Sequence, residues 1–344
     1  MPTMEDIFLA PVFTKEYIPD GLLDMARSLY CQAIAEVLHY SIPHAWDHLP
    51  TDEGGQGAPD TPEMQRARRA WTELTMFPKA VLRQHKRGQR ANQSYAFTKA
   101  LLLRWRDGER ESLWAELPQP GGRRKQREDT TRSRQEACVR LAGLNRPGAA
   151  MQRLVSPGLA GCTQKVKAKL LAKFPAFDHD NCPPRLASPL PAQIAAEAVA
   201  RSIRSFPRGA GAGPTGLRAD FLAQCIGRGD DDPYVQTFRD LAQLFADGYA
   251  PSYLRSWYGG GSLVGVGKPG KSLEEDARPI VTGEVWRRLA FKCTFAADRA
   301  HIVEHLRPNQ VGGRRAGCGR DRGPHCSPVV CGSCLPHGHG IPEA

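Results

Sequence analysis

Two short segments are the only clear β-strand candidates in this 344-residue sequence: SLVGV at 262–266 and RPIVT at 278–282. The polar stretch KPGKSLEEDA stands between them, and its length and composition suit the connection of a hairpin. Elsewhere the apolar residues recur mainly at steps of three and four, which is the pattern of amphipathic helices. The sequence therefore predicts an α+β fold that is mainly helical and contains one short β-hairpin.

The helical pattern begins near residue 21 and should end before Pro43. A later helical stretch should be interrupted at Asp107-Gly108, because glycine and aspartate favour turns. No internal repeat of fixed period is visible. The remaining helices are expected at 63–78, 93–117, 135–144, 161–173, 191–205, 216–226, 234–247 and 283–305.

Stretches rich in proline, glycine and charge divide the chain. TDEGGQGAPDTPE has no periodicity, PQPGGRRKQREDTTRSR is strongly basic, and PAFDHDNCPPRLASPLP is a second proline-rich break. Five parts follow from these breaks. They are an N-terminal helix and linker at 1–60, a helical basic region at 61–176, a Pro-rich linker at 177–190, a further folded part at 191–312, and a Gly/Arg/Cys/His tail at 313–344.

The chain carries 47 Lys and Arg against 36 Asp and Glu, a formal net charge of +11. Such an excess favours a polyanionic partner, and we expect RNA or DNA rather than a membrane. No segment approaches the roughly 18 apolar residues of a membrane span, and the start has no signal-peptide pattern. Scattered single cysteines fit reduced thiols. We expect an intracellular protein of the nucleus or cytoplasm.

A phosphate-binding motif occurs at 265–272, where GVGKPGKS formally matches the P-loop of nucleotide triphosphatases. Pro269 removes one of the backbone N–H groups on which phosphate binding by such a loop depends. The acidic SLEEDA then stands where the phosphate-facing start of a long helix should be. These features make a P-loop-like NTPase the less favoured alternative.

The same region resembles the N-terminal part of reverse transcriptases encoded by non-LTR retrotransposons. Five pieces occur in the matching order: SFPRGAGAGPTGLRADFL (205–222), FADGYAPSYL (245–254), GGSLVGVGKPG (260–270), ARPIVTGEVWRRLAFK (277–292) and LRPNQVG (306–312). The upstream pieces MFPKAVL, RWRDGERESLW, LVSPGLA and AKFP look like the region preceding the polymerase. The resemblance covers most of residues 71–312 and implies that 191–312 is the fingers and the start of the palm of a right-hand polymerase.

The resemblance implies a nucleotide-binding role for Lys268 and Arg278, which would contact the phosphates of an incoming nucleotide from the hairpin. Cations on a closing hairpin suit a polyanionic substrate, and the planar guanidinium of arginine suits bidentate phosphate contact. Gly213, Pro214 and Gly216 would form the turn before the first fingers helix. The alternative for the two cations is that they are solvated side chains on an exposed turn.

Three further cations lie at helical spacing after the second strand: Arg287, Arg288 and Lys292. They could follow the phosphate backbone of a template and so bind nucleic acid. An ordinary solvated helix face has the same spacing. Both interpretations remain open from the sequence.

The catalytic metal ligands implied by the resemblance are missing from these 344 residues. Such polymerases hold Mg²⁺ on palm aspartates that follow the QVG segment, and neither aspartate motif occurs here. The run Asp230-Asp231-Asp232 precedes the hairpin, which is the wrong order. We therefore assign no catalytic residue and no cofactor, and expect a truncated, inactive pseudoenzyme that binds nucleic acid. The alternative is a non-enzymatic basic nucleic-acid-binding or scaffold protein.

The tail crowds cysteine and histidine into its last residues. Cys331 and Cys334 have the spacing of half a zinc knuckle, and Cys318 with Cys326 would supply a second half. The tail has no apolar periodicity to fold around such ligands, so this site is the weaker alternative. A disordered tail, or one read in a changed frame after Gly312, is the favoured interpretation.

Overall fold

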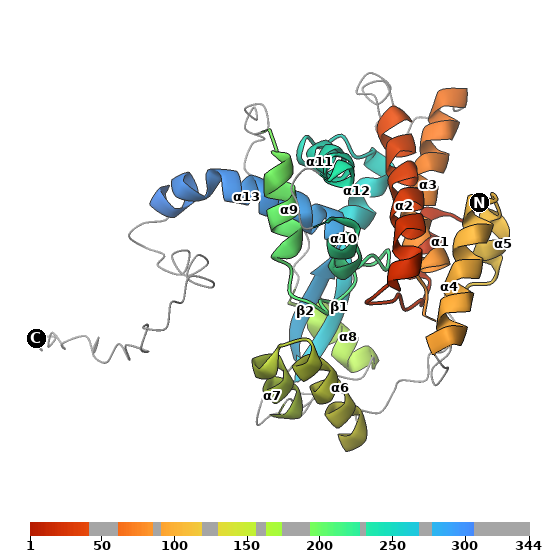
Figure 1. The fold of residues 1–344 in the computed structure, drawn as a ribbon. Helices are drawn as coiled ribbons and strands as arrows, with labels where there is room; N and C mark the ends of the chain where they lie inside the picture. The colour runs from red at the N-terminus through yellow and green to blue at the C-terminus, as the bar shows by residue number, and fades with distance from the viewer. Residues whose placement is uncertain are drawn as a thin grey trace, which may run out of the picture. The chain divides into compact units, whose positions relative to one another are not determined.

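The computed structural model describes residues 1–40, 61–84, 91–118, 130–155, 163–173, 193–227, 232–267 and 277–305 (Figure 1). Within these ranges the chain is mainly helical and has one two-stranded antiparallel sheet, which confirms the predicted fold class. Residues Met1–Ala296 form one compact unit, and Ala297–Ala344 form a second.

The first eight helices precede the proline-rich break around residue 180. They are α1 (Met4–Leu9), α2 (Asp20–Tyr40), α3 (Pro62–Val81), α4 (Ala91–Arg106), α5 (Arg110–Ala115), α6 (Thr131–Gly143), α7 (Pro147–Val155) and α8 (Gln164–Leu171). The rest are α9 (Ala196–Arg204), α10 (Ala219–Cys225), α11 (Pro233–Ala246), α12 (Ser252–Gly259), β1 (Gly261–Gly267), β2 (Ala277–Gly283) and α13 (Val285–His305).

The predicted interruption at Asp107-Gly108 is confirmed: the break between α4 and α5 falls there, and Gly108 has a positive φ of 91°. The helix α2 is described as far as Tyr40, and Pro43, where its end is predicted, lies outside the described residues. One prediction was wrong: α3 continues through Pro78 to Val81. Its last turn is fully packed, because Pro78 and the following residues to Leu82 are all buried. Packing therefore outweighs the backbone hydrogen bond that the proline removes.

Three helices were not expected from periodicity, because each is short. The helix α1 is stabilised by a capping box in which Thr3 and Asp6 exchange hydrogen bonds. The helix α7 begins with Pro147 at its first position, where the fixed φ of proline suits a helix start. The third is α12. Short helices depend on caps and tertiary contacts more than on an apolar stripe.

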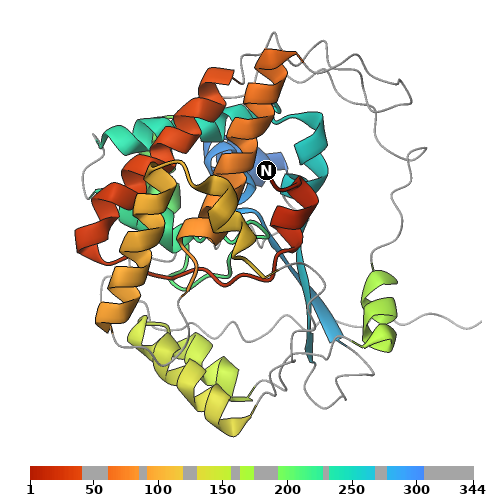
Figure 2. The same ribbon diagram turned by 90° about the vertical axis from the view of Figure 1, so that its right-hand side faces the viewer.

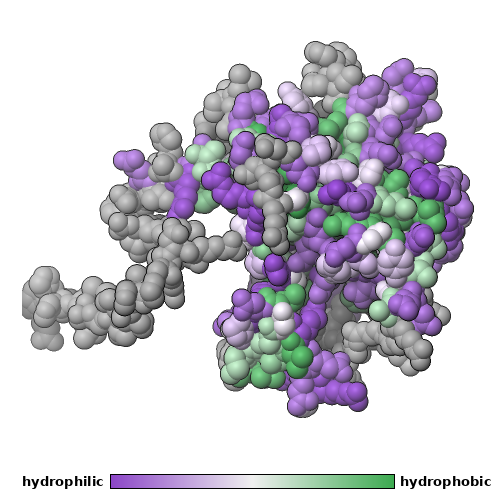
Figure 3. Space-filling view, in the orientation of Figure 1, coloured by the Kyte–Doolittle hydropathy of each residue, from purple (hydrophilic) through white to green (hydrophobic). Residues whose placement is uncertain are grey.

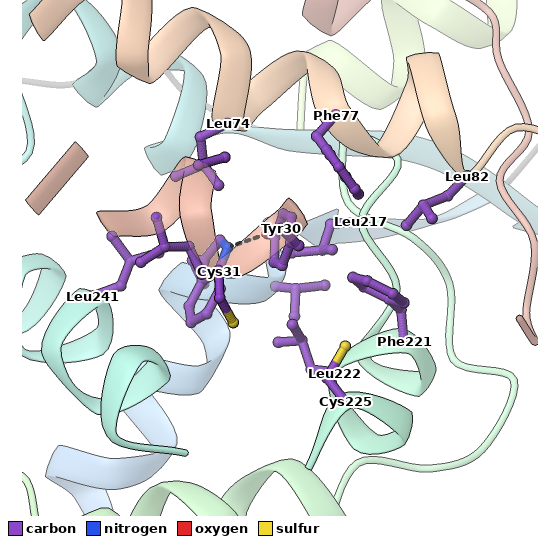
Figure 4. Packing of buried hydrophobic residues seen from close by; sticks show 14 of the residues in the cluster. Tyr30, Cys31, Leu74, Phe77, Leu82, Leu217, Phe221, Leu222, Cys225 and Leu241 are labelled. Atoms are coloured by element: carbon purple, nitrogen blue, oxygen red, sulfur yellow. Dashed lines mark hydrogen bonds between the residues drawn. The ribbon is translucent and has the colours of Figure 1, made fainter. Parts of the chain in front are cut away.

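The main hydrophobic core joins α1–α5 to α9–α13. Tyr30 of α2 is buried in this core and contacts four aromatic rings, those of Phe77, Phe221, Phe238 and Trp286, at centroid distances of 5.1, 5.3, 6.5 and 6.4 Å. Figure 4 shows Tyr30 with Phe77 and Phe221. The Trp286 Nε1–H donates a hydrogen bond to the Tyr30 hydroxyl at 2.9 Å. Residues of the predicted segments 1–60, 61–176 and 191–312 thus share a single core.

The hairpin forms in the expected place. Strand β1 pairs antiparallel with β2, and Leu263 lies opposite Val281 while Val266 lies opposite Arg278 (Figure 2). Helix α8 packs on the end of β2, where Val166 and Leu170 cover Ala277. The connecting residues 268–276 lie outside the described ranges.

The helical pair α6–α7 buries little of its apolar surface. Ala150 is its buried residue, whereas Val139, Met151 and Val155 are 73%, 62% and 76% exposed. Hydrophobic surface is visible over these helices in Figure 3. Their connection carries Asn145 in the left-handed region with a φ of 54°.

We predict that Tyr30→Phe lowers the free energy of unfolding by about 1–3 kcal/mol, because it leaves the buried Trp286 N–H without its acceptor. Chemical denaturation of both proteins measures the difference. Tyr249→Phe is the matched control, since Tyr249 is 43% exposed and its hydroxyl can be replaced by water. Equal stability of Tyr30→Phe and wild type would contradict a stabilising role for this hydrogen bond.

Candidate nucleic-acid interface

A glycine-rich loop at residues 207–218, called the glycine loop below, connects α9 to α10. Side chains hold its backbone at several points. The Gly209 N–H donates to both carboxylate oxygens of Asp220, at 2.9 and 3.2 Å. The Arg218 guanidinium donates to the Ala210 carbonyl at 3.1 Å. The loop therefore has a defined path although glycine allows many conformations.

Gly213, Pro214 and Gly216 do lie in a β-turn. The Gly216 N–H donates to the Gly213 carbonyl at 2.9 Å, and Pro214 occupies the second position, where its fixed φ is favourable. Gly216 has a φ of 85°, a conformation that favours glycine. Its carbonyl accepts a hydrogen bond from the Thr14 hydroxyl, so the N-terminal segment fixes this turn.

Glu284 is the residue that joins this turn to the hairpin and α13. Its side chain is fully buried, and its carboxylate accepts from the Thr215 backbone N–H, from the Thr215 hydroxyl at 3.0 Å and from the Val285 N–H at 3.2 Å. A buried carboxylate needs such donors because the protein interior solvates its charge poorly. The sequence patterns did not indicate Glu284.

Opposing effects act on the pKa of Glu284. Burial raises the pKa, while the hydrogen bonds from Thr215 and Val285 and the positive charge of Lys79 lower it in part. Lys79 is itself buried and donates from its Nζ to the carbonyls of Ile7 and Phe8 at 2.5 and 3.1 Å. This ammonium is thus held by the C-terminal end of α1.

The structure brings together two of the three cations predicted on α13. The guanidinium of Arg288 and the ammonium of Lys292 both lie over the Phe206 ring, with centroid distances of 5.0 and 4.8 Å. Burial lowers the pKa of Arg288 and of Lys292, and the charge of Arg288 further lowers the pKa of Lys292. Within the described ranges neither cation forms an ion pair with a carboxylate. We call Phe206, Arg288 and Lys292 the cation cluster.

Arg287 lies on the neighbouring row of α13 and is exposed. A Cβ atom at Gly283 would come within 2.3 Å of its Nη2, so glycine there leaves room for the guanidinium. Arg278 is exposed on β2, one residue after Ala277, whose carbonyl accepts a hydrogen bond from Lys173 Nζ at 2.7 Å. Lys268 lies outside the described residues, as does most of the P-loop-like stretch.

The metal alternatives find no support in the described part of the chain. Both carboxylate oxygens of Asp232 are used at the start of α11: they accept from the backbone N–H of Gly227 at 2.8 Å and of Tyr234 at 2.9 Å. No group of three or more His, Cys, Asp or Glu side chains that could hold a metal ion occurs among the described residues. Asp230, Asp231 and the tail cysteines lie outside them.

No protein-family model matches the chain, and searches of curated proteins and of solved structures give no match either. Among the helices in the described ranges, none is long and apolar enough to cross a membrane.

We predict that Gly213→Ala lowers the free energy of unfolding by about 3 kcal/mol, since the added Cβ has no room. That atom would lie 2.6 Å from Glu284 Oε1 and 2.9 Å from the Glu284 Cα. Gly211→Ala is the matched control in the same loop, where a Cβ would be 3.5 Å from Thr282 Cγ2, an ordinary contact. Urea unfolding measures both variants. Similar stability of the two would show that Glu284 does not restrict the turn.

Proposed function

We propose that this chain is a reverse-transcriptase-like protein of the non-LTR retrotransposon type, whose fingers-like part binds RNA or single-stranded DNA. The observation that carries the proposal is the cation cluster, in which Arg288 and Lys292 share one aromatic ring beside the glycine loop. The hairpin with Arg278 ends directly before the same helix. The five sequence pieces that resemble this class supply the loop, the hairpin and the helix.

Electrostatics supports a polyanionic ligand at the cation cluster. Two like charges one helical turn apart repel each other, and partial burial removes part of the water that would screen them. A phosphate group placed between them would lower the energy of both. The buried Glu284 carboxylate does so in part, since its charge raises the pKa of Arg288 against the effect of burial, but the described residues supply no ion pair to either cation.

The non-enzymatic alternative uses the same cations. A basic scaffold protein would bind nucleic acid through the cation cluster without any role for Arg278. A reverse-transcriptase-like fingers region would in addition bind a nucleoside triphosphate through Arg278 and Lys268. Triphosphate binding that is weakened by Arg278→Ala therefore separates the two proposals.

We predict that affinity for single-stranded RNA falls steeply as salt rises, because binding releases counterions. The double change Arg287→Gln with Lys292→Gln should make the plot of log affinity against log salt less steep by about 0.7 for each phosphate that is no longer bound. Arg66→Gln with Lys99→Gln is the matched control, since these exposed cations lie on α3 and α4 and the change in net charge is equal. Fluorescence anisotropy across a salt series measures the slopes. Identical slopes for the two double variants would place binding elsewhere.

We predict that the purified 344-residue polypeptide does not extend a primer when given template, Mg²⁺ and all four deoxynucleotides. Two-metal phosphoryl transfer needs paired carboxylates, and the aspartate motifs of this polymerase class do not occur in the sequence. A gel-based extension assay, with an active reverse transcriptase as control, makes the measurement. Template-dependent extension would contradict this prediction. If Asp232→Asn then abolished the extension, Asp232 would be a metal ligand and not only the cap of α11.

A further inference from the structure

The outer face of α13 carries an exposed aromatic side chain. Phe291 is 65% exposed, the largest exposed fraction of any Phe, Tyr or Trp in the described residues. Its ring stacks on that of Phe295, with centroids 5.8 Å apart and an interplanar angle of 25°. A single exposed apolar residue needs no explanation by itself. The surroundings of Phe291 are what make it informative.

Anchoring in the core fixes the rotation of α13 about its axis. Trp286 is buried and donates its N–H to Tyr30, and Leu289 and Cys293 are buried on the same side of the helix. With 3.6 residues per turn, this places Phe291 on the outer side. The exposure of Phe291 therefore follows from the packing of the opposite face.

Cations lie beside this aromatic pair on two rows of the helix. Arg287, Phe291 and Phe295 follow one another at four-residue steps and form one row. Arg288 and Lys292 form the adjacent row, where both lie over the Phe206 ring. Residues 285–296 contain these three cations and no acidic residue. An aromatic face bordered by positive charge is thus presented on the surface of α13.

We propose that Phe291 is a stacking platform for an unpaired base of RNA or DNA, with Arg287, Arg288 and Lys292 contacting the adjacent phosphates. This inference rests on the proposed nucleic-acid binding and deepens it by selecting single strands. Sites for single strands combine cations that follow the backbone with aromatic rings on which bases stack. A duplex offers its phosphates to the same cations, but its bases are already stacked on one another.

Two kinds of partner could contact Phe291: a single strand of nucleic acid or an apolar protein surface. Charge complementarity distinguishes them. A neutral apolar partner would contact Phe291 but would leave three cations partly dehydrated and unmatched. A single strand satisfies both parts of the surface, because each nucleotide brings one aromatic base and one negative phosphate. The chemistry of α13 therefore favours the single strand.

The test measures binding of a labelled, unstructured single-stranded RNA and of a matched duplex to the full chain. Phe291→Ala should weaken single-strand binding by about 5- to 160-fold, the range for removal of one base stack, and should change duplex binding much less. The salt slope for the single strand should stay unchanged, because every phosphate-binding cation is still present. Phe291→Leu should behave like Phe291→Ala, since leucine keeps apolar area but has no aromatic face.

Phe13→Ala is the matched control, since Phe13 is 61% exposed on the N-terminal segment; it should bind like wild type. The proposal that Phe291 stacks on a base is refuted if Phe291→Ala binds the single strand as tightly as wild type. It is also refuted if Phe291→Ala weakens single-strand and duplex binding equally. It is also refuted if Phe291→Leu keeps wild-type affinity, which would indicate an apolar contact. Absence of any binding by the wild-type chain at low salt would instead refute the proposed function itself.

Discussion

The buried carboxylate of Glu284 is the interaction on which the geometry of the candidate interface depends. It accepts hydrogen bonds from the turn of the glycine loop through Thr215 and from the first residue of α13 through Val285. Because Glu284 directly follows β2, a single side chain fixes the relation of the hairpin, the loop and the helix. Hydrogen bonds to a buried charged group are strong, and removing one partner is costly. These contacts explain why the loop keeps one conformation.

Periodicity predicted the parts of the fold that are long or strongly patterned. Two short apolar segments and the polar connection between them located β1 and β2, and helical periodicity located α2 and α11. The same rules failed at Pro78, because tertiary packing decided the outcome there. They also missed α12, whose eight residues are too few to show a clear stripe. Local patterns report local preference, and these elements depend on contacts far away in the sequence.

At the candidate site, too, local patterns indicated some residues and missed those that depend on distant contacts. Spacing and charge indicated Arg288 and Lys292, but no local pattern could show that Phe206 would lie beneath them, since Phe206 is far from both cations in the sequence. The sequence patterns did not indicate Glu284, although it directly precedes the apolar start of a helix, because glutamate is not among the residues preferred at an N-cap. Its burial, however, results from Gly213, where the lack of a side chain lets the two segments approach.

The N-terminal helices take part directly in shaping the proposed interface. Thr14 donates to the carbonyl of Gly216, and a Cβ on Gly216 would lie 2.9 Å from the Thr14 methyl group and 3.2 Å from Lys79 Cγ. The same Lys79 lowers the pKa of Glu284 through its charge. The turn, the buried carboxylate and the start of α13 are therefore held by contacts with residues that precede residue 191. The N-terminal part of the chain in this way helps to fix the geometry of the proposed nucleic-acid interface.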